Sequence, residues 1–100
     1  MFTFDIKKTG TDLLVTLKGR LDGVVAPQLH EAMSTIYGEK VSSVTFDAKE
    51  LEYISSAGLR VIVFVKQKLG EGVQLYLKDA SAEIKSVMEL TGFSNFVEMI

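Results

Sequence analysis

The spacing of apolar residues changes period along the chain, and this change restricts the fold more than any other feature. Near the N-terminus every second residue is apolar in two short runs, which is the period of a strand with one buried face. The apolar residues of these runs are Phe2, Phe4 and Ile6, then Leu13, Val15 and Leu17. A turn at Thr9-Gly10-Thr11 separates them, so residues 1–18 are predicted to form a β-hairpin and residues 19–23 a loop.

After this loop the apolar spacing becomes that of a helix. Pro27 suits the first turn of a helix, because its missing N–H leaves no hydrogen bond unmade there. Leu29, Met33 and Ile36 follow at intervals that place them on one helical face. Gly38 is predicted to end this helix, since glycine readily adopts the backbone conformation that terminates a helix.

Residues 57–69 are ambiguous on propensity alone. Their centre, residues 61–65, is β-branched and aromatic, which favours a strand. The flanks favour a helix: serines precede the segment as cap candidates, Lys66 and Lys68 suit the negative end of a helix dipole, and Gly70 is typical of the residue after a helix. The segment is also longer than a normal strand. We therefore predict a buried helix over residues 57–69.

The rest of the chain alternates strands with helices. The remaining elements are predicted as a strand at Val44 and Phe46 that runs into Asp47, a strand at 73–77, and a short last strand at 96–100. Between the last two strands a helix is predicted that is capped at Asp79 or Ser81, carries Ile84, Val87 and Met88, and stops at Gly92. The order ββαβαβα(β) predicts an α/β fold, a mixed central β-sheet with about three to four helices packed on it. Phe93 and Phe96 are expected in the core.

Composition excludes several classes of protein. The chain has 100 residues, 47% of them hydrophobic, and a net charge of −2, which describes one globular domain. It has no cysteine, which excludes disulfides, thiolate metal sites and a cysteine nucleophile. The longest apolar run is far shorter than the ~20 residues of a membrane span. Without an export signal we expect a cytoplasmic protein, and the acidic balance gives no attraction to nucleic acid or anionic membranes.

A hydrolytic active site finds little support in the sequence. His30 is the single histidine, and a Ser–His–Asp hydrolase would need it as the base beside Ser55 or Ser56. The Gly-x-Ser-x-Gly elbow is absent, and His30 falls within the helical pattern that begins at Pro27. A histidine at the surface or the rim of that helix is the favoured interpretation.

Two further groups of residues also have structural interpretations. Asp47, Glu50 and Glu52 lack an aromatic platform for a sugar and are predicted to form a solvated loop. Gly70-Glu71-Gly72 lacks the third glycine of a nucleotide-binding loop and follows a predicted helix, so we interpret it as a helix stop and a tight turn. No cofactor and no metal are predicted, and the chain is not expected to be an enzyme.

The segment Tyr53-Ile54-Ser55-Ser56-Ala57-Gly58-Leu59-Arg60 carries the most functional information. Two adjacent serines stand where a strand-derived loop meets a helix. An N-cap accounts for one serine, but not for two, and not for the small residues Ala57 and Gly58, which let another backbone or molecule approach. A hydroxyl there lies in the positive field of the helix end, so a phosphate added to it would be stabilised.

The sequence from Tyr53 to Ile62 resembles the signature of STAS domains, the sulfate-transporter and anti-sigma-factor-antagonist module. It is most similar to the free-standing bacterial anti-sigma factor antagonists. The resemblance covers the whole chain and implies a single STAS domain over residues 1–100. Three shorter matches stand in the expected order: Gly-Arg-Leu-Asp at 19–22, Phe46-Asp47, and Leu90-Thr91-Gly92-Phe93.

The resemblance implies a phosphorylation switch. In this family an anti-sigma factor that is itself a serine kinase phosphorylates a serine of the antagonist, and that serine matches Ser56, with Ser55 as second choice. The unphosphorylated antagonist binds the anti-sigma factor and frees sigma, whereas the phosphorylated form lets go until a serine phosphatase resets it. Asp22 matches a family aspartate expected near the site. The other residues expected at or beside the partner contact are Gly23, Ser55, Ala57, Gly58 and Leu59.

One position departs from the family pattern. The aspartate that precedes the phosphorylated serine is Ser55 here, which can supply a hydrogen bond but no charge. This departure leaves an alternative, a STAS scaffold for another signalling partner without phosphorylation control. A small hydrolase that uses Ser55 or Ser56 is the alternative from a different class. No nucleic-acid or membrane partner is expected, and the chain is expected to be a monomer or a weak dimer.

Overall fold

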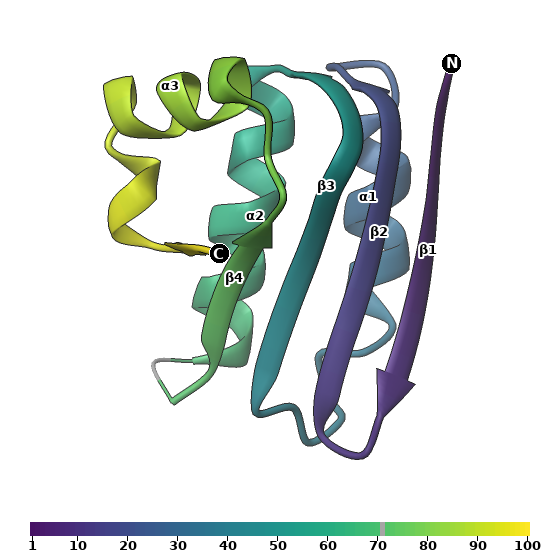
Figure 1. Ribbon diagram of the computed structural model, residues 1–100. Coiled ribbons are helices and arrows are strands. Elements are labelled where there is room, and N and C mark those ends of the chain that lie inside the picture. The colour runs from purple at the N-terminus through teal and green to yellow at the C-terminus, as the bar shows by residue number, and fades with distance from the viewer. Residues whose placement is uncertain (71) are drawn as a thin grey trace.

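The predicted alternation of strands and helices is present in the computed structural model, which describes residues 1–70 and 72–100. The strands are β1 (Phe2–Thr9), β2 (Asp12–Leu21), β3 (Ser43–Ile54), β4 (Gln74–Lys78) and β5 (Glu98–Met99). The helices are α1 (Ala26–Ser34), α2 (Ser56–Leu69) and α3 (Ala82–Leu90), followed by the 3-10 turn η1 (Phe93–Asn95). The order ββαβαβα(β) and the α/β class are confirmed (Figure 1).

The five strands form one mixed sheet in the order β1-β2-β3-β4-β5. β1 and β2 are antiparallel, as the predicted hairpin requires, and each later neighbour pairs in parallel. β2 extends to Leu21, so the prediction of a loop from residue 19 is wrong for its first three residues. The strand continues because Leu21 pairs with Ile54 of β3 and is fully buried, a partner that local sequence does not reveal.

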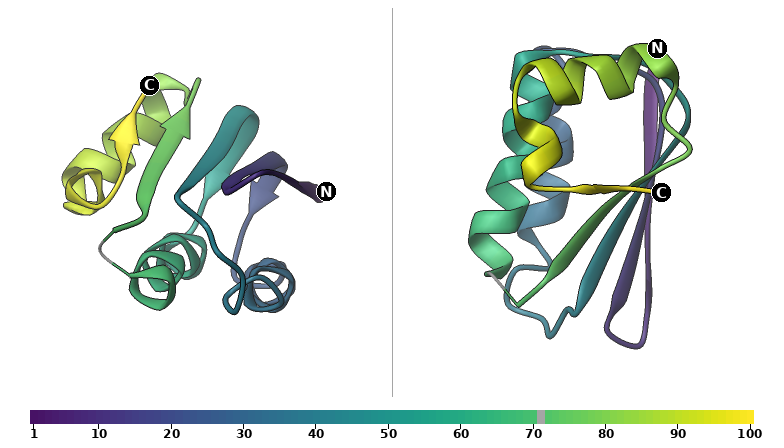
Figure 2. Two further views of the ribbon diagram at one scale, coloured as in Figure 1. Left: turned by 90° about the horizontal axis from the view of Figure 1, so that it is seen from below. Right: turned by 60° about the vertical axis from the view of Figure 1, so that its left-hand side comes forward.

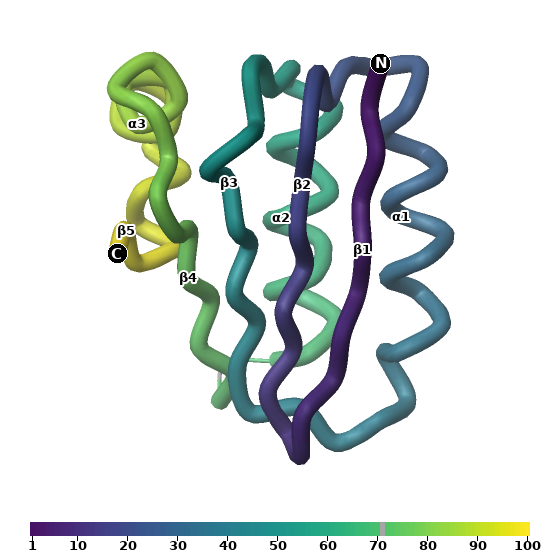
Figure 3. The backbone as a smooth tube through the Cα atoms, turned by 45° about the vertical axis from the view of Figure 1, so that its right-hand side comes forward, coloured from purple at the N-terminus to yellow at the C-terminus, as the bar shows by residue number. Residues whose placement is uncertain are grey.

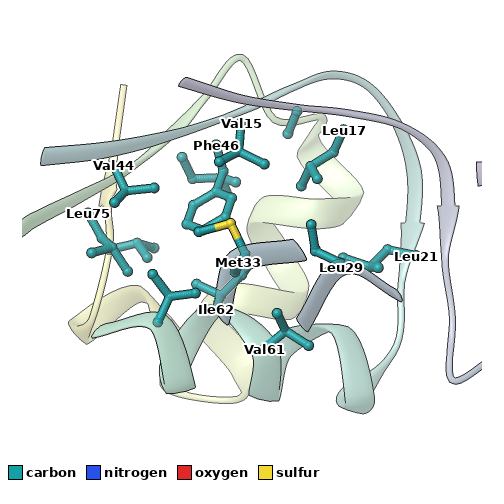
Figure 4. Close-up of a cluster of buried hydrophobic side chains, with 14 of the residues drawn as sticks. Val15, Leu17, Leu21, Leu29, Met33, Val44, Phe46, Val61, Ile62 and Leu75 are labelled. Carbon is teal, nitrogen blue, oxygen red and sulfur yellow. The ribbon is translucent and has the colours of Figure 1, made fainter. Parts of the chain in front are cut away.

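Helices α1 and α2 cover the same face of the sheet, and the other face is open (Figure 2, left). The core lies between the sheet and these two helices, where buried side chains of the strands and helices point toward one another (Figure 4). Phe46 of β3 and Met33 of α1 meet at its centre. α3 lies beyond the carboxyl end of β4 (Figure 1).

The ambiguous segment at 57–69 is helical, as its flanks predicted. α2 begins one residue earlier, at Ser56, and ends before Gly70, whose φ of +94° suits glycine. Its apolar residues are helical because they pack on the sheet, which overrides their β propensity. α1 ends at Ser34, earlier than the predicted stop at Gly38. In the predicted turn at Gly70-Glu71-Gly72, Glu71 lies outside the described residues.

β3 is longer than predicted because it contains two bulges. The strict alternation of buried side chains gives way to burial of every third residue, at Leu51 and Ile54, and the register against β2 shifts twice. Each shift adds a residue to β3, so pairs of adjacent polar residues face solvent. Asp47, Glu50 and Glu52 therefore lie on a strand, and the predicted loop is wrong. Glu50 and Glu52 are solvated, whereas Asp47 is half-buried.

The C-terminal segment differs from prediction at one aromatic residue. Phe93 is partly buried and packs against the core, as expected, but Phe96 is 45% exposed. Val97 occupies the buried position instead, at 5% exposure. Phe93–Asn95 form a short 3-10 turn with Phe96 as its C-cap, so the last strand is only Glu98–Met99, shorter than the predicted 96–100. The turn places Phe96 outward and Val97 inward.

Candidate functional site

The candidate site lies where β2 and β3 end side by side. The two strands are parallel, so their carboxyl ends reach the same edge of the sheet, and each leads into a helix on the same face (Figure 3). The backbone N–H of Ser55 donates to the carbonyl oxygen of Leu21 over 2.8 Å, which joins the two strand ends. Crevices at the carboxyl ends of parallel strands are a common place for binding sites in α/β folds.

The two adjacent serines have different environments. Ser55 is the N-cap of α2: its backbone is extended, and its Oγ accepts a hydrogen bond from the Gly58 N–H over 3.2 Å. Ser56 is the first residue of the helix and is exposed. Within the part of the chain that the structure describes, no hydrogen bond involves Oγ of Ser56. Ser55 thus has a structural role, and Ser56 presents a hydroxyl to solvent.

Gly58 and Leu59 pack the start of α2 against the sheet. A Cβ added to Gly58 would lie 2.7 Å from Cγ of Leu21 and 3.0 Å from Cγ1 of Ile54, so a larger residue would push the helix away. The groups that approach Gly58 closely are therefore the chain's own side chains from the ends of β2 and β3, rather than a partner's backbone. The side chain of Leu59 is only 2% exposed and belongs to the core.

Asp22 organises the loop opposite these serines. Its Oδ1 accepts hydrogen bonds from the N–H groups of Val24 and Val25, over 3.0 and 3.2 Å, and its carbonyl oxygen accepts from Ala26. This loop exposes Gly23 and also Val24, whose side chain is 80% exposed. Sequence reasoning missed Val24, because a valine between two predicted elements carries no signal that it faces solvent.

A groove of about 270 Å³ runs between α1 and α2 beside Ser56. Its lining is mostly small or apolar, formed by Gly23, Ala26, Pro27, His30, Ala57, Arg60 and Val61. The ring of His30 is half-buried and contacts Phe64 of α2 edge-on, with 4.7 Å between ring centroids. Among the described residues no hydrogen bond joins His30 to either serine, so the geometry of a Ser–His pair is not present.

Other parts of the described chain offer less to a ligand. Residues 1–70 and 72–100 contain no group of three or more histidine or carboxylate side chains placed to hold a metal ion. None of their helices is long and apolar enough to cross a membrane. The hydroxyl of Tyr37 is buried without a hydrogen-bond partner among the described residues, and burial raises the pKa of this phenol. Tyr37 follows α1 at its far end from Ser56, packed near Phe64.

Comparison with known proteins gives consistent similarities. The STAS domain family model matches residues 3–100. BtrV of Bordetella bronchiseptica, provisionally named an anti-sigma factor antagonist, is 32% identical over 82 residues, which cover 81% of this chain and 71% of BtrV. The anti-sigma-B factor antagonist of Listeria monocytogenes is 27% identical over 99 residues, covering 97% of this chain and 87% of the relative.

The same fold occurs in solved structures. The phosphorylated form of the Bacillus cell fate determinant SpoIIAA superposes with a TM-score of 0.76 at 19% sequence identity, covering 98% of this chain and 91% of that one. At this identity the likeness concerns the fold. It agrees with the mixed sheet and the helix order described above.

Proposed function

The chain belongs to the STAS domain family, and from this membership we propose that it is an anti-sigma factor antagonist switched by phosphorylation of Ser56. In its unphosphorylated form it binds an anti-sigma factor of the serine-kinase type and so frees a sigma factor. Phosphorylated at Ser56 it lets this partner go, and a serine phosphatase restores it. It is a binding module of the cytoplasm with no catalytic step of its own.

The exposed hydroxyl of Ser56 at the first position of α2 is the observation that carries this proposal. A kinase can reach it without unfolding the helix start. Ser55 is a poorer acceptor, because its Oγ already caps the helix through Gly58 and the residue is partly buried. The relatives named as anti-sigma factor antagonists support the class of partner. SpoIIAA, which shares the fold, exists in a phosphorylated form.

The surface around Ser56 suits a protein partner. Gly23 and Val24 are exposed and Ala57 is partly exposed, and these residues offer small or apolar contacts, while Asp22 is half-buried. Gly58 and Leu59, from the same predicted contact set, support the surface from below. A partner that covers this region would remove Ser56 from water.

Release of the anti-sigma factor follows from the charge of the phosphate rather than from a change in the fold of the antagonist. A phosphoserine carries about −1.5 to −2 charges at neutral pH, and the N-terminus of α2 stabilises that charge, so the domain stays folded. Within a desolvated contact the same dianion near Asp22 is unfavourable, and a like or unpaired charge at an interface costs several kcal/mol. A cost of ~2.7 kcal/mol lowers affinity about a hundredfold.

The replacement of the family aspartate by Ser55 favours one second candidate, a STAS scaffold for another signalling partner without phosphorylation control. Ser55 keeps the cap through its hydrogen bond but brings no carboxylate next to Ser56. If the kinase needs that carboxylate, Ser56 stays unmodified.

The test starts with peptide mass spectrometry of the protein from its own host, grown with and without stress. Phosphate on Ser56 is expected. Affinity for the purified serine-kinase anti-sigma factor of that host is then compared between wild type, Ser56→Asp and Ser86→Asp, an exposed position on α3 that serves as the matched control. Ser56→Asp should weaken binding strongly and Ser86→Asp should not. Phosphate absent under every condition, with equal binding by all three proteins, would favour the scaffold.

A further inference from the structure

Arg60 lies one helical turn after Ser56 on the same face of α2. In a helix, residues four apart are neighbours, with about 5–6 Å between their Cβ atoms. Side chains on a helix also lean toward its N-terminus, so a residue covers the turn that precedes it. These two rules place the first turn of α2, where Ser56 is exposed, within reach of the Arg60 side chain. We infer that Arg60 binds and orients the phosphate carried on Ser56, an inference that rests on the proposed phosphorylation.

The guanidinium of Arg60 is available for this role. The residue is exposed, and no hydrogen bond or ion pair engages it within residues 1–70 and 72–100. It lines the groove between α1 and α2 beside Ala57, and on its other side a hollow of about 310 Å³ that includes Phe64 and Phe93. A planar fork of donors in this position matches the oxygens of a phosphate.

Other charged groups at this end of the molecule are placed differently. Arg20, the cation at the end of β2, is stacked on the ring of Tyr53, 4.3 Å from its centroid, whereas the next residue of the strand, Leu21, is buried in the core beneath the helices. Arg20 therefore belongs to the open face of the sheet. Asp22 faces the site from the loop before α1, with Oδ1 engaged by two N–H groups. His30 is the other titratable residue in the groove lining.

The local charge around Ser56 therefore differs from the family pattern at the preceding residue. The family pattern places a carboxylate before the modified serine, whereas this chain has the neutral Ser55 there and a cation one turn later. Arg60 favours the dianionic form of the phosphate and holds it over the helix start. It is a positioning residue: it acts on the modified form and leaves the hydroxyl form of Ser56 unengaged.

The experiment uses the full chain with phosphoserine placed at position 56 by genetic code expansion, which needs no cognate kinase. The 31P chemical shift is followed through the second ionisation of the phosphate, near pH ~6. Arg60→Gln should raise the pKa of that ionisation by about half a unit, since a nearby cation stabilises the dianion. Arg60→Lys should retain most of the shift, because it keeps the charge and loses the fork.

Arg20→Gln is the matched control, because it removes the same charge from the same end of the protein. It should leave the phosphate titration unchanged. Repeating the comparison in a His30→Gln background removes the imidazole from the groove lining, so that a difference between the variants is due to the arginine. Circular dichroism of unmodified Arg60→Gln establishes that the variant folds.

An unchanged titration in folded Arg60→Gln, or an equal shift in Arg20→Gln, would overturn the inference. This outcome differs from failure of the proposed function. Because the phosphoserine is supplied by translation, absence of phosphate in the host bears on the proposed switch alone, and absence of coupling to Arg60 bears on this inference alone.

Discussion

The starts of α2 and α3 share the same cap and differ in what surrounds it. Ser55 accepts a hydrogen bond from the N–H of Gly58 over 3.2 Å, and Ser81 accepts one from the N–H of Ile84 over the same distance. Both serines have extended backbones and are followed by a helix of the core. A serine cap by itself therefore does not distinguish a functional site.

The difference lies in the residues that follow the cap. At the third helical position α2 has Gly58, whose lack of a side chain lets the helix start pack closely against the strand ends. At the same position α3 has the buried side chain of Ile84. At the first position α2 has the hydroxyl of Ser56, whereas α3 has Ala82. One helix start thus combines a glycine packed closely against core side chains with a free hydroxyl, and the other has a buried apolar side chain.

The largest expected effect is at the apolar anchor. Ile84→Ala should lower the free energy of unfolding by about 3 kcal/mol, because it removes a buried side chain and leaves a cavity. Chemical denaturation measures this loss. Lys85→Ala, at an exposed neighbouring position, is the control and should change stability little. Equal stability of both variants would show that α3 is not anchored at Ile84.

The second largest effect is expected for Gly58→Ala, which should lower the free energy of unfolding by about 2 kcal/mol. Its Cβ would overlap Leu21, which is fully buried and cannot move aside, and this cost exceeds alanine's advantage in a helix. Gly38→Ala is the matched control, because space around Gly38 is open. If Gly58→Ala unfolds at the same denaturant concentration as wild type, the close seating of α2 is incorrect.

Removal of either serine cap should lower the free energy of unfolding by the same amount. Ser55→Ala and Ser81→Ala should each destabilise the protein by about 1 kcal/mol, since each leaves one N–H of the first turn without its acceptor. Ser86→Ala, within α3 and exposed, controls for the loss of a serine. A much larger loss at Ser55 alone would mean that it does more than cap the helix.

The smallest expected effect is that of placing an aspartate at the first position of α2 or of α3. Ser56→Asp and Ala82→Asp should each stabilise by about 0.5 kcal/mol through the helix dipole. Ser56→Asp should gain about 0.3 kcal/mol more by pairing with Arg60, a contribution that Ser86 cannot offer to Ala82→Asp. Thermal unfolding at low salt resolves the order, and the difference should vanish in an Arg60→Gln background.

Much of the fold could be predicted from local sequence. The hairpin was predictable because Phe4 and Leu17 belong to runs with strict period two. The helix at 57–69 was predictable from its flanks, although residues 61–65 alone favour a strand. The prediction of β3 is too short, because its two bulges replace the period of two by a period of three. No local residue pattern marks a bulge as part of a strand.

The candidate site was predictable in place but not in detail. The pair Ser55-Ser56 marked the helix start, and the resemblance to STAS domains indicated Ser56 as the serine that we propose to be modified. The sequence did not reveal that Val24 faces solvent or that Gly58 packs against the side chains of Leu21 and Ile54. These properties depend on which strand ends meet, and the strands concerned lie about thirty residues apart in the chain.

The sequence by itself determined the order of strands and helices, the family and the position of the serine pair, because periodicity, caps and motifs are local properties. Tertiary structure alone decided that β2 and β3 end together, that Ser55 is engaged by the helix while Ser56 is free, and that Phe96 is exposed while Val97 is buried. Those outcomes follow from parallel pairing and close packing between distant segments, where the available space and hydrogen-bond partners are set by the whole fold.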